Sequence, residues 1–217
     1  MGGNLDAAAV WAAQRGDAEA FRVLYRDLQP RLLRYLGTLV GADAEDVASE
    51  TWLQVARDFQ GFTGDADGFR GWVTTIARHR ALDQLRRTRR RRPSVPVIPQ
   101  RLAELGGVGL AGNADDTAAG AIEAVTTEAA LRLIATLPPD QAEAVLLRAV
   151  VGLDAATAAA VVGKRPGAVR SAAHRGLRML AKRLADASGP TIPVGRANDR
   201  DNEGVTPGLG LALKDMR

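Results

Sequence analysis

The stretch that decides the fold runs from Asp154 to Leu184 and reads DAATAAAVVGKRPGAVRSAAHRGLRMLAKRL. It opens with an aspartate, a common helix cap, and an alanine-rich run that favours a short helix. Gly163 and Pro166 then mark a turn. Beyond the turn, apolar residues recur at steps of three and four, which indicates one face of a longer helix; they are Val169, Ala173, Leu177, Leu180 and Leu184. This order predicts a helix-turn-helix motif.

The face of the longer helix opposite this apolar row is basic. Arg170, His174, Arg178 and Lys182 follow one another at steps of four, and residues 164–183 contain no acidic residue. The alternative to a DNA-binding helix is an ordinary amphipathic surface helix, but its polar face would commonly carry both acidic and basic residues. A helix with one packed face and one row of hydrogen-bond donors suits the major groove of duplex DNA. We therefore interpret this helix as a DNA-recognition helix.

A second basic concentration, with six arginines in seven residues, lies at 86–92. It ends a helix that we predict from about Phe69 toward Arg90, because an apolar row steps by four along it; the row is Phe69, Val73, Ala77, Ala81 and Leu85. Its basic stripe suits a nucleic-acid backbone, since neutralising phosphates releases counterions. A solvated basic helix end, favoured by the helix dipole, is the alternative.

Two further helices are expected before this one. The first spans Asp17 to Val40, with Asp17 as N-cap and Pro30 as a kink or break. The second begins near Ala44 and opens with a cluster of acidic residues; these are Asp43, Glu45, Asp46 and Glu50. The cluster complements the positive end of the helix dipole, or it docks a basic partner. Residues 63–68 read as a polar loop.

Prolines and glycines divide the chain. Pro93, Pro96 and Pro99 lead into a glycine-rich segment with no helical period until Ala121. We therefore predict an all-α protein with two small helical domains at 10–92 and 127–186, joined by a flexible linker at 93–126. A mostly disordered tail is expected at 187–217. In the second domain, Leu137-Pro138-Pro139-Asp140 ends one helix and opens the next.

Composition excludes several classes of protein. The 217 residues include no cysteine and two histidines, which argues against disulfides, thiol catalysis and a histidine-rich metal site. No metal or cofactor is expected. Only three of the 29 basic residues are lysines, so nearly all positive charge sits on arginines, whose planar fork suits phosphates and guanine edges. No apolar run reaches membrane-spanning length, so we expect a soluble, cytoplasmic protein without membrane insertion.

Three rival signals carry less weight. His79 and Asp83 match the HxxxD spacing of some acyl transferases, but such a pair forms on any helix and its neighbours are arginines. Trp72 could stack on an unpaired base, although a tryptophan beside an apolar row is more often a core residue. The linker glycines lack the Gly-Lys-Ser/Thr ending of a phosphate-binding loop.

The order of motifs resembles a known family. Gly16-Asp17-Ala18-Glu19-Ala20-Phe21, Asp43-Ala44-Glu45-Asp46-Val47 and Trp72-Val73-Thr74-Thr75-Ile76-Ala77-Arg78 resemble the promoter-melting domain of bacterial extracytoplasmic-function (ECF) sigma factors. Leu137-Pro138 and the helix-turn-helix are similar to their C-terminal domain. The resemblance covers most of residues 10–92 and 128–184.

The resemblance implies three surfaces. The acidic cluster Asp43, Glu45, Asp46 and Glu50 would dock on the clamp helices of the largest subunit of core RNA polymerase. The melted −10 strand would contact Thr63, Asp65, Arg70, Trp72, Arg78, His79, Arg86, Arg87 and Arg90. The −35 duplex would contact Lys164, Arg165, Arg170, Ser171, His174, Arg175 and Arg178.

The expected function is therefore that of a sigma factor without catalytic residues. It would bind core RNA polymerase and promoter DNA, and an anti-sigma factor is a further expected partner. The alternative is a helix-turn-helix repressor or activator that binds duplex DNA without polymerase. An enzyme that uses His79 and Asp83 is a more distant alternative.

Overall fold

The computed structural model describes residues 7–91 and 118–187, with side chains described for 7–90 and 127–186. The described chain is helical throughout and contains no strand. This confirms the predicted all-α fold class. The predicted disordered tail and most of the predicted linker lie outside the described residues.

The N-terminal domain is built from four α-helices. They are α1 (Ala7–Gln14), α2 (Ala18–Val40), α3 (Ala44–Asp58) and α4 (Ala66–Arg91), with short 3-10 turns η1 (Gly41–Asp43) and η2 (Phe59–Gly61). Asp17 caps α2 as predicted, because its Oδ1 accepts from the amides of Glu19 and Ala20. Of the predicted kink or break at Pro30, the break is wrong: α2 continues through Pro30, whose missing N–H removes one helical hydrogen bond.

Two features of this domain differ from the sequence prediction. Helix α1 was not predicted. The Gln14 side chain anchors this helix by donating to the carbonyl oxygens of Phe59 and Phe62, at 3.2 and 2.6 Å. Helix α4 begins three residues earlier than expected, at Ala66. Asp65 Oδ1 accepts from the amide of Gly68 at 2.8 Å, so the loop ends in a helix cap.

The C-terminal domain contains α6 (Ala118–Ala135), α7 (Pro139–Val145), α8 (Ala155–Val162) and α9 (Pro166–Ala187). Helix α7 continues into a π-helical turn, η3 (Leu146–Val151), which ends at Gly152 in the left-handed conformation. Helices α8 and α9 form the predicted helix-turn-helix. Asp154 caps α8, and Gly163 adopts a φ of 67° in the turn between them.

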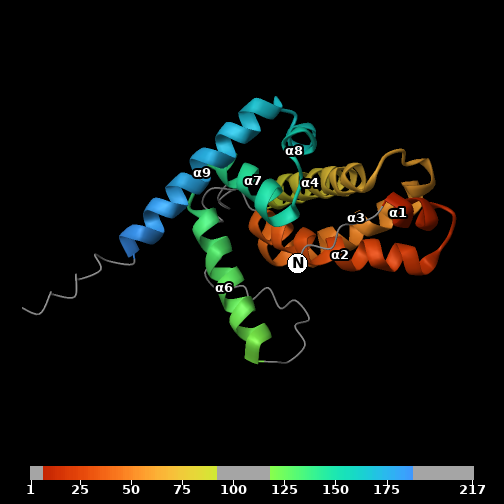
Figure 1. The fold of residues 1–217 in the computed structure, drawn as a ribbon, viewed down its shortest axis with the longest axis horizontal. Coiled ribbons are helices and arrows are strands. Elements are labelled where there is room, and N and C mark those ends of the chain that lie inside the picture. Colours follow the sequence, from red (N-terminus) through yellow and green to blue (C-terminus); the bar gives the residue numbers. More distant parts are fainter. Residues whose placement is uncertain (1–6, 92–117, 188–217) are drawn as a thin grey trace, which may run out of the picture.

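The predicted apolar row of α9 is only partly buried. Val169 and Ala173 are buried, but Leu177 and Leu184 are half exposed. The reason is that α9 packs on α7 and α8 through its N-terminal half and extends past them, as Figure 1 shows.

The two domains lie against each other. Helix α8 packs against α4 (Figure 1), and η3 packs against α2. The buried side chains of both domains form one continuous apolar cluster. Helix α6 begins at Ala118, within the segment predicted as linker, because Ala118–Ala124 are mostly strong helix formers.

Candidate nucleic-acid interface

The turn and exposed face of the helix-turn-helix carry every residue predicted for duplex DNA. Val169, Ala172 and Ala173 bury the inner face of α9. The predicted residues are all exposed: Lys164, Arg165, Arg170, Ser171, His174, Arg175 and Arg178. The structure therefore brings this predicted set together on one side of the domain, as a recognition helix requires.

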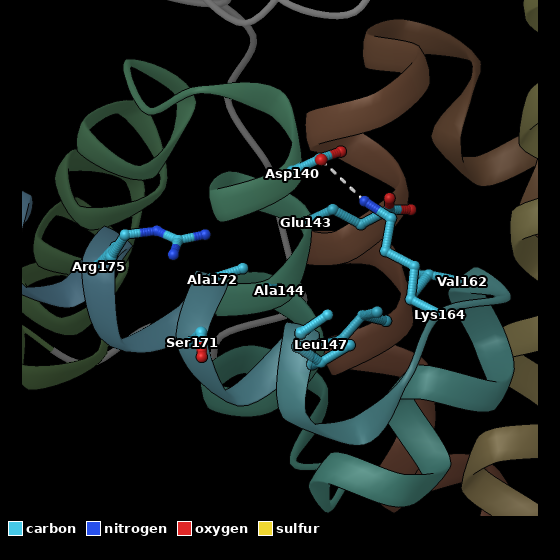
Figure 2. A pocket seen from close by; sticks show the side chains of 11 residues that line it. Asp140, Glu143, Ala144, Leu147, Val162, Lys164, Ser171, Ala172 and Arg175 are labelled. Atoms are coloured by element: carbon cyan, nitrogen blue, oxygen red, sulfur yellow. Dashed lines mark ion pairs between the residues drawn. The ribbon is translucent and has the colours of Figure 1, made fainter.

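A pocket of about 310 Å³ lies where α7, α8 and α9 meet. Lys164, Ser171 and Arg175 line it from the basic side, and Asp140 and Glu143 line it from α7 (Figure 2). Lys164 Nζ lies 2.8 Å from Asp140 Oδ2, and both side chains are substantially exposed. A phosphate can compete for such an exposed lysine at little cost, because surface ion pairs stabilise proteins weakly.

The residues predicted for the melted strand spread over three environments. Thr63, Asp65, His79, Arg86, Arg87 and Arg90 are exposed. They follow the loop and the outer face of α4, where Arg86 Nη1 also donates to Asp83 Oδ1 at 2.8 Å. The exposed arginines of α4 form a basic track that suits a nucleic-acid backbone.

Trp72 belongs to an aromatic cluster beside the loop. Its ring stacks on Phe62 with centroids 5.1 Å apart and on Phe59 at 6.4 Å. The indole also contacts the ring of Phe69 and remains partly exposed. Such an arrangement fits both a core role and a platform on which an unpaired base stacks.

Arg70 is buried, with 8% of its surface exposed. Its Nη1 donates to Asp67 Oδ1 at 2.6 Å, and its Nε lies 3.8 Å from Asp27 Oδ2. Asp27 also accepts from Arg31 at 3.2 Å. These contacts tie the first turn of α4 to α2.

Arg78 is engaged by the other domain. Its Nε donates to Glu143 Oε1 at 2.7 Å, and Tyr35 Oη donates to the same oxygen at 3.3 Å. Burial raises the pKa of Tyr35 well above its ordinary value, and the charge of Glu143 raises it further. Burial lowers the pKa of Arg78, but hydrogen bonding and charge from Glu143 outweigh this and raise it overall.

The acidic cluster forms an exposed face of α3. Glu45, Asp46 and Glu50 are exposed, whereas Asp43 is half-buried and accepts from Gln84 at 3.1 Å. Leu53 lies one turn after Glu50 and is 60% exposed. Sequence reasoning overlooked Leu53, although its spacing of three from Glu50 places it on the same face.

The geometry supports neither an enzyme site at His79 and Asp83 nor a metal site in the described residues. His79 is exposed, and Asp83 pairs with Arg86. In the described residues, no three His, Cys, Asp or Glu side chains gather closely enough to hold a metal ion. Within the same residues, no helix combines the length and apolar character that crossing a bilayer requires.

Comparisons with known proteins match the two helical domains. Residues 24–91 match the model of Sigma-70 region 2, and residues 127–180 match that of Sigma-70, region 4. The chain resembles CnrH, as solved in complex with the cytosolic domain of CnrY, with a TM-score of 0.53 and 21% identity. That match covers 85% of this chain and 99% of CnrH, and it supports the fold.

Curated relatives carry the comparison further. The chain is 34% identical over 176 residues to the ECF RNA polymerase sigma factor BldN of Streptomyces coelicolor, covering 80% of this chain and 64% of BldN. It is 32% identical over 195 residues to the ECF RNA polymerase sigma factor SigD of Mycobacterium tuberculosis, covering 86% of this chain and 87% of SigD. The chain therefore belongs to the ECF RNA polymerase sigma factors, non-enzymatic proteins that associate with RNA polymerase and direct promoter-specific initiation of transcription.

Proposed function

We propose that the two domains divide the promoter between them. The exposed face of α9 reads the −35 element as duplex, and the loop at 63–68 with the basic track of α4 captures the melted −10 strand. The acidic face of α3 docks on the clamp helices of the largest subunit of core polymerase. The single observation that carries this proposal is the one-sided charge of α9, which is buried and apolar on one side and exposed and basic on the other.

Reading duplex DNA needs donors on a rigid support. Val169, Ala172 and Ala173 fix α9 on its own domain, so its arginines project from a held backbone. Arg170, Arg175 and Arg178 can make bidentate contacts with guanine edges or phosphates. Lys164 and Arg165 lie in the turn before α9, where they are suited to the flanking phosphates.

Capturing the melted strand needs stacking and charge, because unstacking a base costs a few kcal/mol. Trp72 and Phe62 offer a partly exposed aromatic surface beside Thr63 and Asp65. The exposed arginines of α4 then hold the adjacent backbone. Arg70 supports the loop from within, since its guanidinium already pairs with Asp67 and Asp27.

Docking on polymerase needs an exposed face of opposite charge to the clamp helices. Asp46 and Glu50 are one helical turn apart and exposed, and Leu53 adds an apolar contact beyond them. Charges at the rim of such a surface speed association, whereas a central apolar residue slows dissociation.

Action on RNA polymerase also places the protein in the cytoplasm. An anti-sigma factor stays a prediction; it would have to cover these same surfaces.

Run-off transcription tests the proposal. Purified core polymerase transcribes fragmented genomic DNA from the source organism with and without this protein. We expect transcripts of defined start that require the protein, with two shared sequence elements upstream. Silence of the core enzyme, together with specific binding of duplex by the protein alone, would favour the helix-turn-helix regulator instead.

A further inference from the structure

Glu143 occupies a partly buried anion site on the other domain. The site consists of Arg78 and Tyr35, which both donate to Glu143 Oε1, at 2.7 and 3.3 Å. The Arg78 and Glu143 side chains are each about one-fifth exposed, and Tyr35 is fully buried. An ion pair removed from water to this extent stabilises a structure only where the geometry is good, which the short bond from Arg78 Nε provides.

A second contact closes the same interface. A Cβ placed on Gly71 of α4 would clash with the methyl group of Thr157 of α8 and would lie 3.8 Å from Thr157 Cβ. Glycine is the residue that allows α8 to approach α4 so closely. On the neighbouring side of the interface, Arg31 Nη1 donates to the carbonyl oxygen of Val151 at 3.5 Å. Helix α8 therefore covers the part of α4 that carries Gly71. Glu143 of α7 binds the guanidinium of Arg78.

This arrangement conflicts with promoter binding. Positions −35 and −10 are 25 base pairs apart, which is roughly 85 Å along a duplex at 3.4 Å per pair. In the structure, Glu143 touches Arg78 of the −10 set and lines one small pocket with Ser171 and Arg175 of the −35 set. The two DNA-binding sets are therefore too close together to reach both elements of an extended promoter.

We propose that this closed form is self-inhibited, and that Glu143 stands in the place of a phosphate of the melted −10 strand. A carboxylate and a phosphate diester share a single negative charge and two accepting oxygens. The anion site of Arg78 and Tyr35 therefore receives Glu143 in the closed form and a backbone phosphate in the open form. This assigns Tyr35 to the −10 interface, and it rests on the proposed role of Arg78 there.

The chain offers a direct way to lock the closed form. It contains no cysteine, and the distance of 3.8 Å between the two Cβ positions matches the average for a disulfide. The double variant G71C/T157C, oxidised, would hold α8 on α4. Thr157→Cys alone is the matched control, because it cannot form the bond and leaves Gly71 without a Cβ that would clash with α8.

We expect the disulfide to form readily in the free protein and to lower run-off transcription by core polymerase at least about tenfold, since a locked chain cannot reach the open state. Reduction should restore the level of the Thr157→Cys variant. Full transcription by the oxidised protein would overturn the proposal, as would failure of the disulfide to form. Failure of the proposed promoter contacts is separate, because it would appear in the unsubstituted chain without any disulfide.

Glu143→Gln tests the residue itself. It keeps the side chain's shape but removes its charge, so the closed form weakens and disulfide formation in the G71C/T157C background slows several-fold. The same change should strengthen binding of the full chain with core polymerase to a −10 fork probe that lacks a −35 element. Asp186→Asn, an equal charge change at an exposed position near the end of α9, is the control. Equal cross-linking rates for the two variants would contradict the role of Glu143.

Discussion

Gly176 of α9 lies directly against Val145 of α7: a Cβ at position 176 would stand 2.8 Å from Val145 Cγ2 and 3.3 Å from the carbonyl oxygen of Gln141. Alanine is normally favoured over glycine inside a helix by about 1 kcal/mol. Here the added methyl group has no room, and overpacking typically costs about 1–3 kcal/mol. The missing side chain is therefore what lets the recognition helix seat on its domain.

We predict that Gly176→Ala destabilises the protein and lowers its melting temperature by several degrees. Gly167→Ala is the matched control on the same helix, because nothing lies within 4 Å of a Cβ there. Thermal unfolding followed by circular dichroism measures both variants. A melting temperature for Gly176→Ala at or above that of the unsubstituted chain would show that α9 can shift away from α7.

Charge reversal at Asp46 should weaken association with core polymerase without unfolding the domain. Asp46 is exposed on α3, so its replacement by lysine removes a favourable charge from the proposed docking face. Because rim charges act mainly on association, the on-rate should fall more than the off-rate rises. Asp58→Lys makes the same charge change at the other end of α3 and serves as control. Surface plasmon resonance on immobilised core polymerase gives both rates; equal affinities for the two variants would remove Asp46 from the interface.

Joint replacement of Arg170 and Arg175 by alanine should reduce transcription from promoters that depend on the −35 element. If both residues contact phosphates, the slope of log affinity against log salt should become shallower by about two. A contact with a guanine edge would instead relax specificity at one base pair. Replacing exposed Arg22 and Arg26 of α2 removes the same charge and is the control. An equal loss on a premelted template would point to a folding defect.

Local patterns in the sequence were enough to predict most helices and the exposed basic face of α9. Asp17 and Asp154 were readable as caps because they precede periodic runs. Helix α1 was missed because Ala7–Gln14 is apolar on nearly all sides and shows no stripe. The break at Pro30 was wrongly predicted because the tertiary packing of buried Leu28 and Leu32 keeps α2 helical despite one missing hydrogen bond.

The contacts between domains left no local signal. Arg78 and Glu143 are 65 residues apart in the sequence, and neither position belongs to a periodic pattern that names its partner. Arg70 looked like one of many surface arginines, yet it is buried and pairs with Asp27 and Asp67. Charge patterns therefore predicted which faces are basic or acidic, whereas only the tertiary structure shows which arginines are already paired.

The buried phenol of Tyr35 should make stability fall at alkaline pH. Burial first, and then the charge of Glu143, raises the folded-state pKa of Tyr35 well above 10.0, its ordinary value. Above that ordinary value the unfolded chain has lost the proton that the folded chain keeps, so unfolding releases a proton. Stability is therefore complete below the unfolded pKa and is lost as the pH rises toward the folded pKa. Urea unfolding between pH 9 and about 11 should show a falling midpoint that flattens in Tyr35→Phe. Parallel curves for the two proteins would mean that Tyr35 is not held neutral beside Glu143, and the closed interface would lose one of its two donors.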